Sequence, residues 1–326
     1  MIRFLTRRAL WFVVTAWAVI TLSFLLMRAV PGGPFSSERS LHPVVEANVR
    51  ARYHLDWPMW KQYFHTLGPL NLDEHGLFGD RSDMLGGILT GDLGPSLQHR
   101  DMSVNDVLAQ SLPISIALGL VALAWALCLG LVGGVVSALK PRGVLDIVAR
   151  TLSTAGLALP NFVIAGGLVL VFAFWMPLLP VAGWGSLRHL VLPGFALGAP
   201  FAAYIARLVR TGLLETLSRD YIRTAIAKGV PYRRVVLRHA LPAALMPVVS
   251  YLGPATAGIL TGSLVIERIF AIPGAGSHFV SSALNRDYTL AMGVTLLYTV
   301  LVYGLNVLVD IAYTLLDPRI DLEHDA

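Results

Sequence analysis

Long apolar runs alternate with polar stretches along the whole chain. A helix needs about 20 apolar residues to cross the hydrocarbon core of a bilayer, and six of the runs reach that length. They cover approximately Ala9–Met27, Pro113–Leu139, Ile147–Trp175, Leu190–Val209, Ala243–Val265 and Leu290–Leu316. The pattern predicts an all-α polytopic membrane protein with six transmembrane helices.

The third and fifth runs contain residues that interrupt helices. Gly156 and Pro160 lie in the third run, and Pro247 and Pro254 lie in the fifth. Interruptions are tolerated in a membrane where the freed backbone groups meet protein or water, so both runs are candidates to line a passage. Packing of helices through small residues is the alternative interpretation. The weakly polar pathway-lining candidates are Asn161, Ser250, Thr256, Thr261 and Ser263.

The polar stretches divide the chain into four predicted parts. These are 1–30 (an N-terminal stub and the first span), 31–111 (an extracytoplasmic module), 112–316 (the transmembrane core) and 317–326 (a tail). Inside the core, residues 211–242 form a long polar loop between the fourth and fifth spans. The module is therefore a helical insertion between spans one and two.

Two helices are predicted within the extracytoplasmic module, at Pro43–His54 and Asp56–Leu67, each with a proline near its start. A glycine-rich loop is predicted at Gly68–Thr90. An aromatic group in the second helix either packs against the membrane border and the module's own core or contacts cargo. Its members are Trp57, Trp60, Tyr63 and Phe64.

The stretch Ser218–Pro242 is polar, basic and helix-forming, although it lies between two apolar runs. Ser218 is a candidate N-cap, Gly229 a candidate left-handed residue after the first helix, and Pro231 a candidate first residue of the second. We predict a short helix, a tight turn and another short helix that ends at Pro242. Such order favours a docking element, whereas a solvated basic loop that follows the positive-inside rule is the alternative.

Composition agrees with a membrane protein. Of the 326 residues 55% are hydrophobic and 14% charged, and the mean hydropathy is +0.66. Soluble domains carry roughly a quarter charged residues. The net charge of +5 does not indicate nucleic acid, because the basic residues gather at the borders of the spans. The single cysteine, Cys128, lies in an apolar run and is expected to be a buried packing residue.

The short loops predict the orientation. Arg3, Arg7 and Arg8 precede the first span, and Lys140 and Arg142 lie between spans two and three, so both segments are expected in the cytoplasm. The N- and C-termini are then both cytoplasmic. A cleaved signal peptide is the alternative for the first run, but no small-residue cleavage site follows it.

No catalytic or metal site is predicted. The chain lacks the GxxxxGK[ST] sequence of a nucleotide-binding loop and the HExxH and GxSxG motifs of hydrolases. Ser96 has no neighbouring base that would activate it. The spans also lack a central cluster of ionisable residues, which an ion-coupled carrier usually needs, and the deepest acid is Asp310.

At this point the spacing of the polar loop reveals a resemblance. Arg223-Thr224-Ala225 is followed by Gly229, His239 and Leu241-Pro242. This resembles the "EAA" loop of ABC-transporter membrane subunits. In that loop Glu-Ala-Ala is followed by three residues, a glycine, nine further residues and then Ile-x-Leu-Pro. The glutamate and the isoleucine are replaced here, as in the peptide-permease branch of that family.

Three further segments resemble the B-type subunits of dipeptide and oligopeptide permeases. They are Tyr53-His54-Leu55-Asp56 with the following Gln62-Tyr63, Gly91-Asp92-Leu93-Gly94-Pro95-Ser96, and Phe270–Gly276 with Arg286-Asp287-Tyr288. The Gly68–Thr90 stretch is longer than the usual link of the family. The resemblance covers nearly the whole chain.

The resemblance implies a type I ABC importer (MetI-like) permease fold in a bacterial cytoplasmic membrane. It implies a paralogous C-type permease subunit, two cytoplasmic ABC ATPase subunits and an extracytoplasmic substrate-binding protein as partners. ATP and Mg²⁺ would bind the ATPases, and this chain would bind no cofactor. The residues implied in coupling to the ATPases are Asp220, Tyr221, Arg223, Thr224, Ala225, Lys228, Gly229, Arg233, His239 and Pro242.

The expected function is therefore ATP-driven import of dipeptides or oligopeptides. The same family also handles nickel chelates and some sugars, so the cargo stays open at this stage. A secondary carrier that works alone and a membrane-embedded enzyme are the rivals from other classes. Transport without ATPases would favour the first rival, and turnover by the isolated chain would favour the second.

Overall fold

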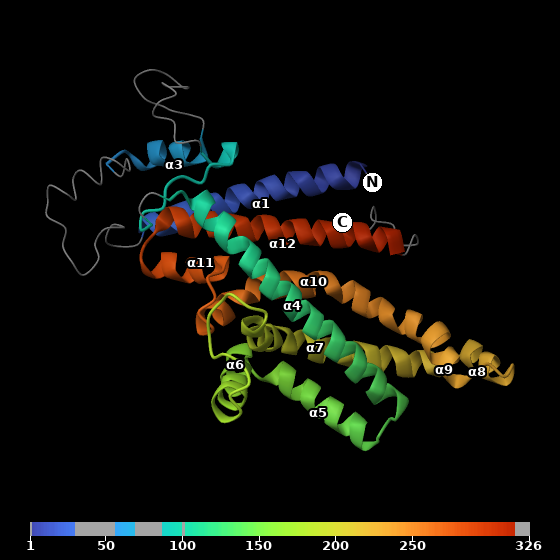
Figure 1. Cartoon of the computed structure of the whole chain (residues 1–326). Helices are drawn as coiled ribbons and strands as arrows, with labels where there is room; N and C mark the ends of the chain where they lie inside the picture. The colour runs from blue at the N-terminus through green and yellow to red at the C-terminus, as the bar shows by residue number, and fades with distance from the viewer. Residues whose placement is uncertain (1, 30–55, 69–86, 100–101, 317–326) are drawn as a thin grey trace. The chain divides into compact units, whose positions relative to one another are not determined.

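The computed structural model describes residues 2–29, 56–68, 87–99 and 102–316, and these residues are almost entirely helical (Figure 1). In chain order the elements are α1 (Ile2–Ala29), α3 (Met59–Leu67), η1 (Ile88–Thr90), α4 (Val104–Leu139), α5 (Val144–Ala158), α6 (Asn161–Leu168), η2 (Val169–Trp175), α7 (Arg188–Leu217), α8 (Asp220–Ala227), α9 (Tyr232–Arg234), η3 (Val235–Ala240), α10 (Leu241–Ile269), α11 (Ala275–Leu284) and α12 (Tyr288–Leu316). The segments η2 and η3 are π-helical, with one extra residue per hydrogen-bonded turn.

Five helices of the described residues are long and apolar enough to cross a membrane. They lie in α1, α4, α7, the continuous stretch Tyr232–Ile269, and α12. The predicted third span is not one helix, because α5 and the α6–η2 segment meet at a bend of 115°. Pro160 sits at the break, where its ring and missing N–H end the first helix. Counting the bent pair as one span gives the six that the sequence predicts.

The helix α4 begins nine residues before the predicted start at Pro113. The Ser103 N–H donates to Asp106 Oδ2 at 3.1 Å, and the Asp106 N–H donates back to Ser103 Oγ at 3.1 Å. This reciprocal pair is a capping box, which satisfies N–H groups that the first turn leaves unbonded. The cap therefore fixes the start of α4 at Val104, and Pro113 is carried inside the helix.

The other predicted elements of the outer module are partly described. The helix predicted at Asp56–Leu67 is present as α3, with Pro58 just before its first residue. The helix predicted at Pro43–His54 lies outside the described residues. Of the predicted loop Gly68–Thr90, only its ends are described, and Ile88–Thr90 forms a 3₁₀ turn.

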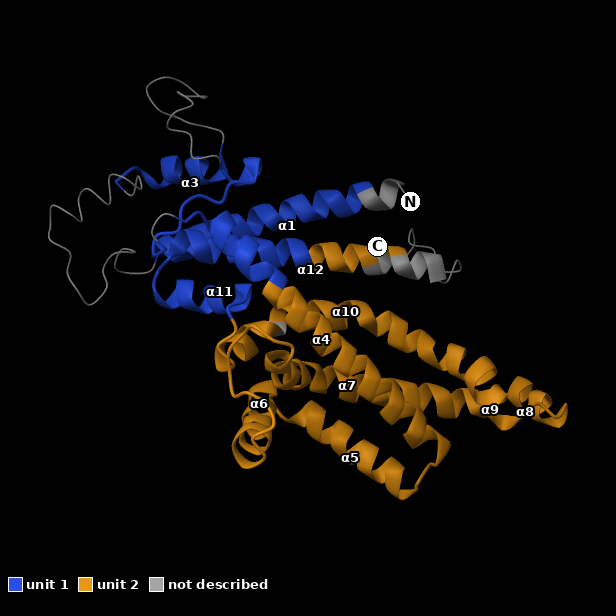
Figure 2. Cartoon of the chain, viewed as in Figure 1, with its two compact units in different colours: residues 1–113, 273–301 blue, residues 114–272, 302–326 orange. Residues whose placement is uncertain are grey.

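Two compact units divide the chain (Figure 2). The first comprises residues 1–113 and 273–301, and the second comprises 114–272 and 302–326.

In the first unit, the aromatic residues of α3 contact the first span. The Tyr63 ring lies edge-on to Phe24 at a centroid distance of 5.3 Å, and its hydroxyl is 2.6 Å from Thr21 Oγ1. This arrangement supports packing at the membrane border, the first of the two interpretations of that aromatic group. Trp60 is more than half exposed and takes no part in this contact.

A buried carboxylate links two family-signature segments of the first unit. Asp287 Oδ2 accepts from Ser96 Oγ at 2.5 Å, and Asp287 Oδ1 accepts from the Leu290 N–H at 3.1 Å. The same carboxylate accepts from the backbone N–H groups of Leu97 and Gln98. Asp287 thus caps α12 and holds the Gly91–Ser96 loop at once.

We expect Asp287→Ala to destabilise the protein by about 3 kcal/mol or more, because several buried donors lose their acceptor at about 1–3 kcal/mol each. The measurement is the thermal midpoint of the purified protein. Asp220→Ala is the matched control, since the Asp220 side chain is almost fully exposed and its ion pair with Arg223, at 3.7 Å, is long. An equal shift in both variants would contradict the role assigned to Asp287.

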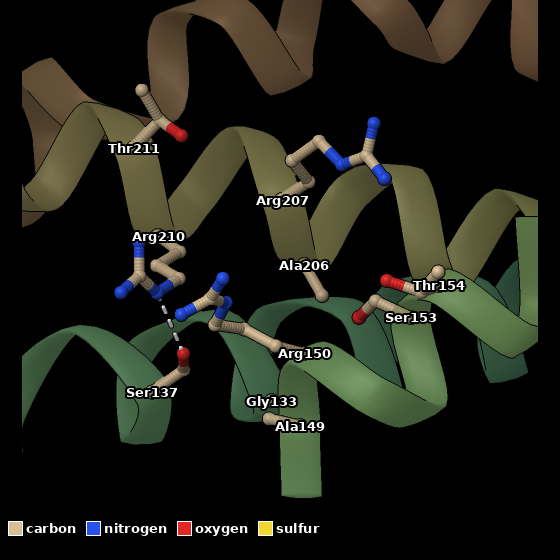
Figure 3. Close-up of a pocket in the computed structure, with 10 residues that line it drawn as sticks. All are labelled: Gly133, Ser137, Ala149, Arg150, Ser153, Thr154, Ala206, Arg207, Arg210 and Thr211. Carbon is tan, nitrogen blue, oxygen red and sulfur yellow. Dashed lines mark hydrogen bonds between the residues drawn. The ribbon is translucent and has the colours of Figure 1, made fainter. Parts of the chain in front are cut away.

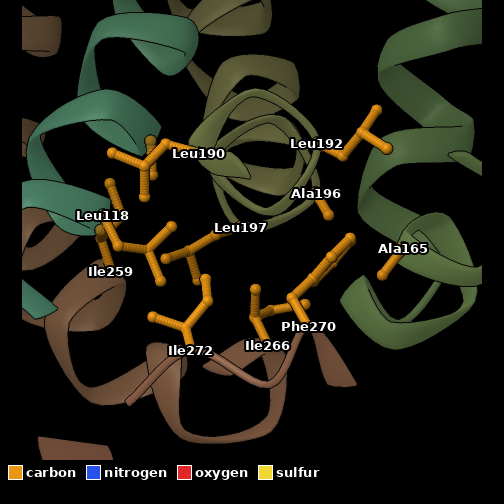
Figure 4. Close-up of a cluster of buried hydrophobic side chains, with 11 residues drawn as sticks. Leu118, Ala165, Leu190, Leu192, Ala196, Leu197, Ile259, Ile266, Phe270 and Ile272 are labelled. Atoms are coloured by element: carbon orange, nitrogen blue, oxygen red, sulfur yellow. The ribbon is translucent and has the colours of Figure 1, made fainter. Parts of the chain in front are cut away.

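In the second unit, a hydrophobic core joins α4, α6, α7 and α10 (Figure 4). Leu197 of α7 lies at its centre beside Ile259 and Ile266 of α10, and Phe270 reaches toward Ala165 of α6. The remaining buried members are Leu118, Ala122, Leu190, Leu192, Ala196 and Ile272. These residues fix α7 as the helix around which the second unit packs.

Glycines bring α4 and α7 into backbone contact. A Cβ on Gly198 would lie 2.4 Å from the carbonyl oxygen of Ala122, and one on Gly134 would lie 2.7 Å from that of Ala206. Gly130 and Gly134 on α4, and Gly194 and Gly198 on α7, are each spaced four residues apart, the spacing that small residues use at close helix crossings. The two helices therefore meet through both glycine pairs.

One sequence interpretation of side-chain placement is wrong, because Cys128 is exposed on the surface of the chain and not buried. Glu267 lies just beyond the predicted end of the fifth run at Val265, but it belongs to the last turn of α10 and is fully buried. Its Oε1 accepts from Ser115 Oγ at 2.7 Å, which supplies the hydrogen bond that a buried carboxylate requires.

Candidate coupling site

The polar loop folds as the predicted helix, turn and helix, at one end of the long helices α7 and α10 (Figure 1). Gly229 has φ +77°, the left-handed conformation that favours glycine. The Gly229 N–H donates to Ile226 O at 2.9 Å, and the Val230 N–H donates to Ala225 O at 3.2 Å. These two bonds form a Schellman motif, which ends α8 and reverses the chain.

An apolar cluster anchors α8 beneath this turn. Ile222 is fully buried and contacts a core made of Leu213 from α7, Ala138 from α4 and Ala244 from α10. Val235 and Ala240 of η3 complete the buried part, and Ala225 packs at its edge. The position of α8 is therefore coupled mechanically to three of the long helices.

The opposite face of α8 is open. Tyr221 and Ile226 are each 50% exposed, and the side chain of Arg223 is 74% exposed. Exposed apolar side chains among basic ones are typical of a surface that a partner protein covers. On α8, Ile222 is thus buried and Ala225 half-buried, whereas Tyr221 and Ile226 are exposed.

The remaining residues implied in coupling are also at the surface. Thr224 donates to Asp220 O at 3.0 Å along α8, and Tyr221 OH lies 3.5 Å from His239 O. Lys228, Arg233 and His239 are exposed on the turn and on the following segment. The structure brings the whole set to one end of the second unit, and its role in coupling stays a prediction.

Two boundary predictions for this loop are wrong. Ser218 does not cap α8; its hydroxyl donates back to Glu215 O at 2.7 Å, and Arg219 is the N-cap residue instead. The second helix does not end at Pro242 but continues through η3 into α10. The π-helical turn of η3 precedes Pro242, and its wider turn gives room for the proline ring, which would clash with a carbonyl in a regular α-helix.

The predicted pathway residues satisfy their polar groups within their own helix. The hydroxyls of Ser250, Thr256 and Thr261 donate to the backbone carbonyls four residues earlier, at 3.1, 2.7 and 3.0 Å. Ser263 donates to Leu260 O and is fully buried. Asn161 is the first residue of α6, at the bend in the third span. Whether these residues line a passage stays a prediction.

A buried ion pair that the sequence analysis missed lies where α4, α5 and α7 meet. Arg210 Nε donates to Asp146 Oδ1 at 2.8 Å, and Arg210 Nη2 donates to Oδ2 at 3.0 Å. Ser137 Oγ and the Arg142 N–H also donate to this carboxylate, at 2.5 and 2.8 Å. The carboxylate, on α5, is fully buried, and its four donors come from α4, α7 and the α4–α5 turn.

We expect Asp146→Asn to lower the amount of folded protein in the membrane several-fold, because removing one partner leaves the Arg210 charge without compensation. Replacing both residues, with Asp146→Leu and Arg210→Met, is expected to restore part of the loss. The readout is the amount of monodisperse protein extracted from membranes. Glu215→Gln is the control, since it breaks an exposed pair with Arg219 that is expected to contribute little. Equal losses in the two single variants would contradict this account.

Among the described residues, no group of three or more His, Cys, Asp or Glu side chains could hold a metal ion.

The architecture is that of a membrane transport subunit, and comparison with known proteins defines the family. Residues 130–322 match the family described as "Binding-protein-dependent transport system inner membrane component", and residues 1–119 match its N-terminal part. The chain belongs to this family of ABC importer permeases.

Full-length relatives place the chain in the peptide-permease branch. It is 43% identical to "Oligopeptide transport system permease protein OppB" of Haemophilus influenzae over 98% of this chain and 99% of that protein. It is 44% identical to OppB of Escherichia coli K12 with the same coverage. It is also 44% identical to "Dipeptide transport system permease protein DppB" of Bacillus subtilis, over 99% of each.

A solved structure shares the fold. The "crystal structure of an amino acid ABC transporter with histidines" matches with a TM-score of 0.51 and 16% identity, over 64% of this chain and 93% of that one. At this identity the match concerns the fold alone, and it confirms the predicted importer permease architecture.

Proposed function

We propose that this chain is the membrane-spanning subunit of an ATP-driven importer of dipeptides and oligopeptides. The observation that carries the proposal is its similarity to OppB and DppB permeases along the entire chain. Cargo would be delivered by a substrate-binding protein outside, and a paralogous permease subunit would form the other half of the pathway.

The coupling loop supplies the mechanism of this proposal. Two ATPase subunits would dock on the exposed face of α8, and their closure on ATP would move it. Because Ile222 is locked into the cluster with α4, α7 and α10, movement of α8 is passed to those helices. The spans would then alternate between inward-facing and outward-facing states, with ATP and Mg²⁺ bound only by the partner subunits.

The orientation follows from the same argument. The ATPases are cytoplasmic, so α8, the α4–α5 turn and both termini would face the cytoplasm of a bacterial cell, and the 31–111 module would lie outside. The basic residues of the coupling loop agree with this placement.

The test is peptide uptake by the assembled transporter in liposomes. Labelled dipeptides and tetrapeptides are offered with the binding protein outside and ATP inside. We expect uptake that requires ATP and this chain, and no uptake of a nickel chelate or a sugar under the same conditions. Uptake of either of those in preference to peptides would replace the cargo assignment, and uptake without the ATPases would contradict the proposal itself.

A further inference from the structure

A pocket lined by three arginines lies beside the buried Asp146 carboxylate (Figure 3). Its volume is about 270 Å³. Arg210 of α7 and Arg150 of α5 point toward one another, and Arg207 lines the pocket from α7 with its guanidinium directed away from α5. Its other polar residues are Ser137, Ser153, Thr154 and Thr211.

Two of the three arginines carry uncompensated charge. Arg210 is bound by Asp146, whereas no ion pair is found for Arg150 or Arg207 within the described part of the chain. The pocket therefore presents two free guanidinium groups and several hydroxyl donors. Guanidinium groups bind phosphate oxygens in a two-pronged geometry, so an anion of this kind matches the pocket.

An apolar cleft of about 550 Å³ adjoins this arginine pocket. The two cavities share Gly133, Ala149, Ser153 and Ala206 in their linings. The cleft continues between α4, α5 and α7 and is walled by aliphatic side chains. They include Leu129, Val132, Leu152, Leu159, Ile164 and Ala199.

Along α7 the order of the two cavities matches the order of polarity across a membrane leaflet. The arginine pocket is lined by Arg207, Arg210 and Thr211, nearer the end of α7, and the cleft by residues from Phe195 to Ala206. The cleft also extends from Leu145, beside the α4–α5 turn, to Leu129, ten residues and so about 15 Å from the end of α4. A charged site at one end of a long apolar cleft is the arrangement that an inserted lipid needs.

We propose that these two cavities form one binding site for an anionic phospholipid, with its phosphate in the arginine pocket and an acyl chain in the apolar cleft. Basic pockets between membrane helices on the cytoplasmic side commonly hold anionic lipid headgroups. The site keeps α5 tied to α4 and α7 through the lipid. This inference goes beyond the transport function and does not depend on the cargo.

A peptide fits the site less well. A free peptide is zwitterionic near pH 7, because its α-amino group has a pKa near 8. The pocket would then need an acid for the amino group, and the one acid in contact with this arginine cluster among the described residues, Asp146, already binds Arg210 and Ser137. An amphiphile with a single anionic end can bind the arginines and needs no acid as a partner for an amino group.

The experiment uses the purified, assembled transporter, stripped of lipid in detergent and offered phosphatidylglycerol or phosphatidylcholine. Native mass spectrometry measures the fraction of complexes that retain a phospholipid. We expect retention of phosphatidylglycerol, reduced roughly fivefold by Arg150→Gln or Arg207→Gln and further in the double variant. Lys140→Gln removes an exposed charge outside the pocket and is expected to leave retention unchanged.

A second variant separates lipid from free phosphate. Ala155→Phe fills the apolar cleft and leaves the arginine pocket intact. If the site binds a lipid, Ala155→Phe loses the retained phosphatidylglycerol. If the site binds inorganic phosphate, the binding measured by calorimetry persists in Ala155→Phe and is lost in the arginine variants. Equal retention of the two lipids, retention unchanged in the arginine double variant, or displacement of the lipid by a cargo peptide would overturn the proposal.

Discussion

Gly229→Val is expected to reduce ATP-driven uptake at least tenfold while the subunits still assemble. The left-handed conformation of Gly229 costs an ordinary L-residue roughly 1–2 kcal/mol, and a β-branched residue more. Because 1.4 kcal/mol is a factor of ten in an equilibrium, the population with a correctly turned α8 falls steeply. The measurements are uptake, ATP hydrolysis and co-purification of the partner subunits.

Gly229→Asn is the matched control for this prediction. Asparagine enters the left-handed region more readily than other non-glycine residues, and a Cβ at this position would meet no atom within 4 Å. We therefore expect it to retain most of the uptake. Gly229 is therefore required for its backbone conformation and not for lack of space. Wild-type uptake by an assembled Gly229→Val variant would contradict this account of the turn.

Gly198→Ala is expected to lower the thermal midpoint of the purified protein by about 4–8 °C. Its new methyl group would lie 2.4 Å from the Ala122 carbonyl oxygen, which belongs to the backbone of α4. A helix cannot move one carbonyl aside cheaply, so α4 and α7 must separate, at a cost near the upper end of about 1–3 kcal/mol for overpacking. Alanine's better helix propensity offsets only about 1 kcal/mol of this.

Gly133→Ala provides the comparison within the same helix pair. A Cβ there would meet the Ala206 methyl at 3.8 Å, an ordinary van der Waals contact. The same substitution should therefore be neutral or slightly stabilising at Gly133. A similar loss at both glycines would mean that glycine as such, and not the close approach at Gly198, determines stability.

Local features of the fold could be predicted from the sequence because their cause is local. The left-handed turn at Gly229 and the break at Pro160 follow from what those two residues allow their own backbone to do. The capping box at Ser103 and Asp106 carries an equally local signal, and it would have placed the start of α4 correctly.

Long-range features were not predictable from one sequence. Ser96 and Asp287 are separated by 191 positions, and Arg210 and Asp146 by 64, so nothing in the spacing pairs them. Both family-signature segments around Ser96 and Asp287 were visible, but their mutual hydrogen bond was not. The continuation of the helix through Pro242 was also not predicted. The helix passes this proline by adopting a π-helical turn just before it, and the sequence analysis did not anticipate that turn.

The candidate coupling site shows the same division. Its residues could be named from the motif spacing around Gly229. Which of them are buried could not, because Ile222 is covered by α4, α7 and α10 and not by its sequence neighbours. The contacts of α8 with these distant helices show that it is anchored to the second unit and is not a solvated loop.

The central claim is that α8 receives the motion of an ATPase. The direct test is site-specific crosslinking of Arg223→Cys in a Cys128→Ser background, since Cys128 is the single native cysteine. Ser186→Cys, in the exposed segment before α7, is the control expected to react only from outside the cell. The account predicts a crosslink between residue 223 and the ATPase that changes with ATP; labelling of residue 223 from outside, without a crosslink, would contradict it.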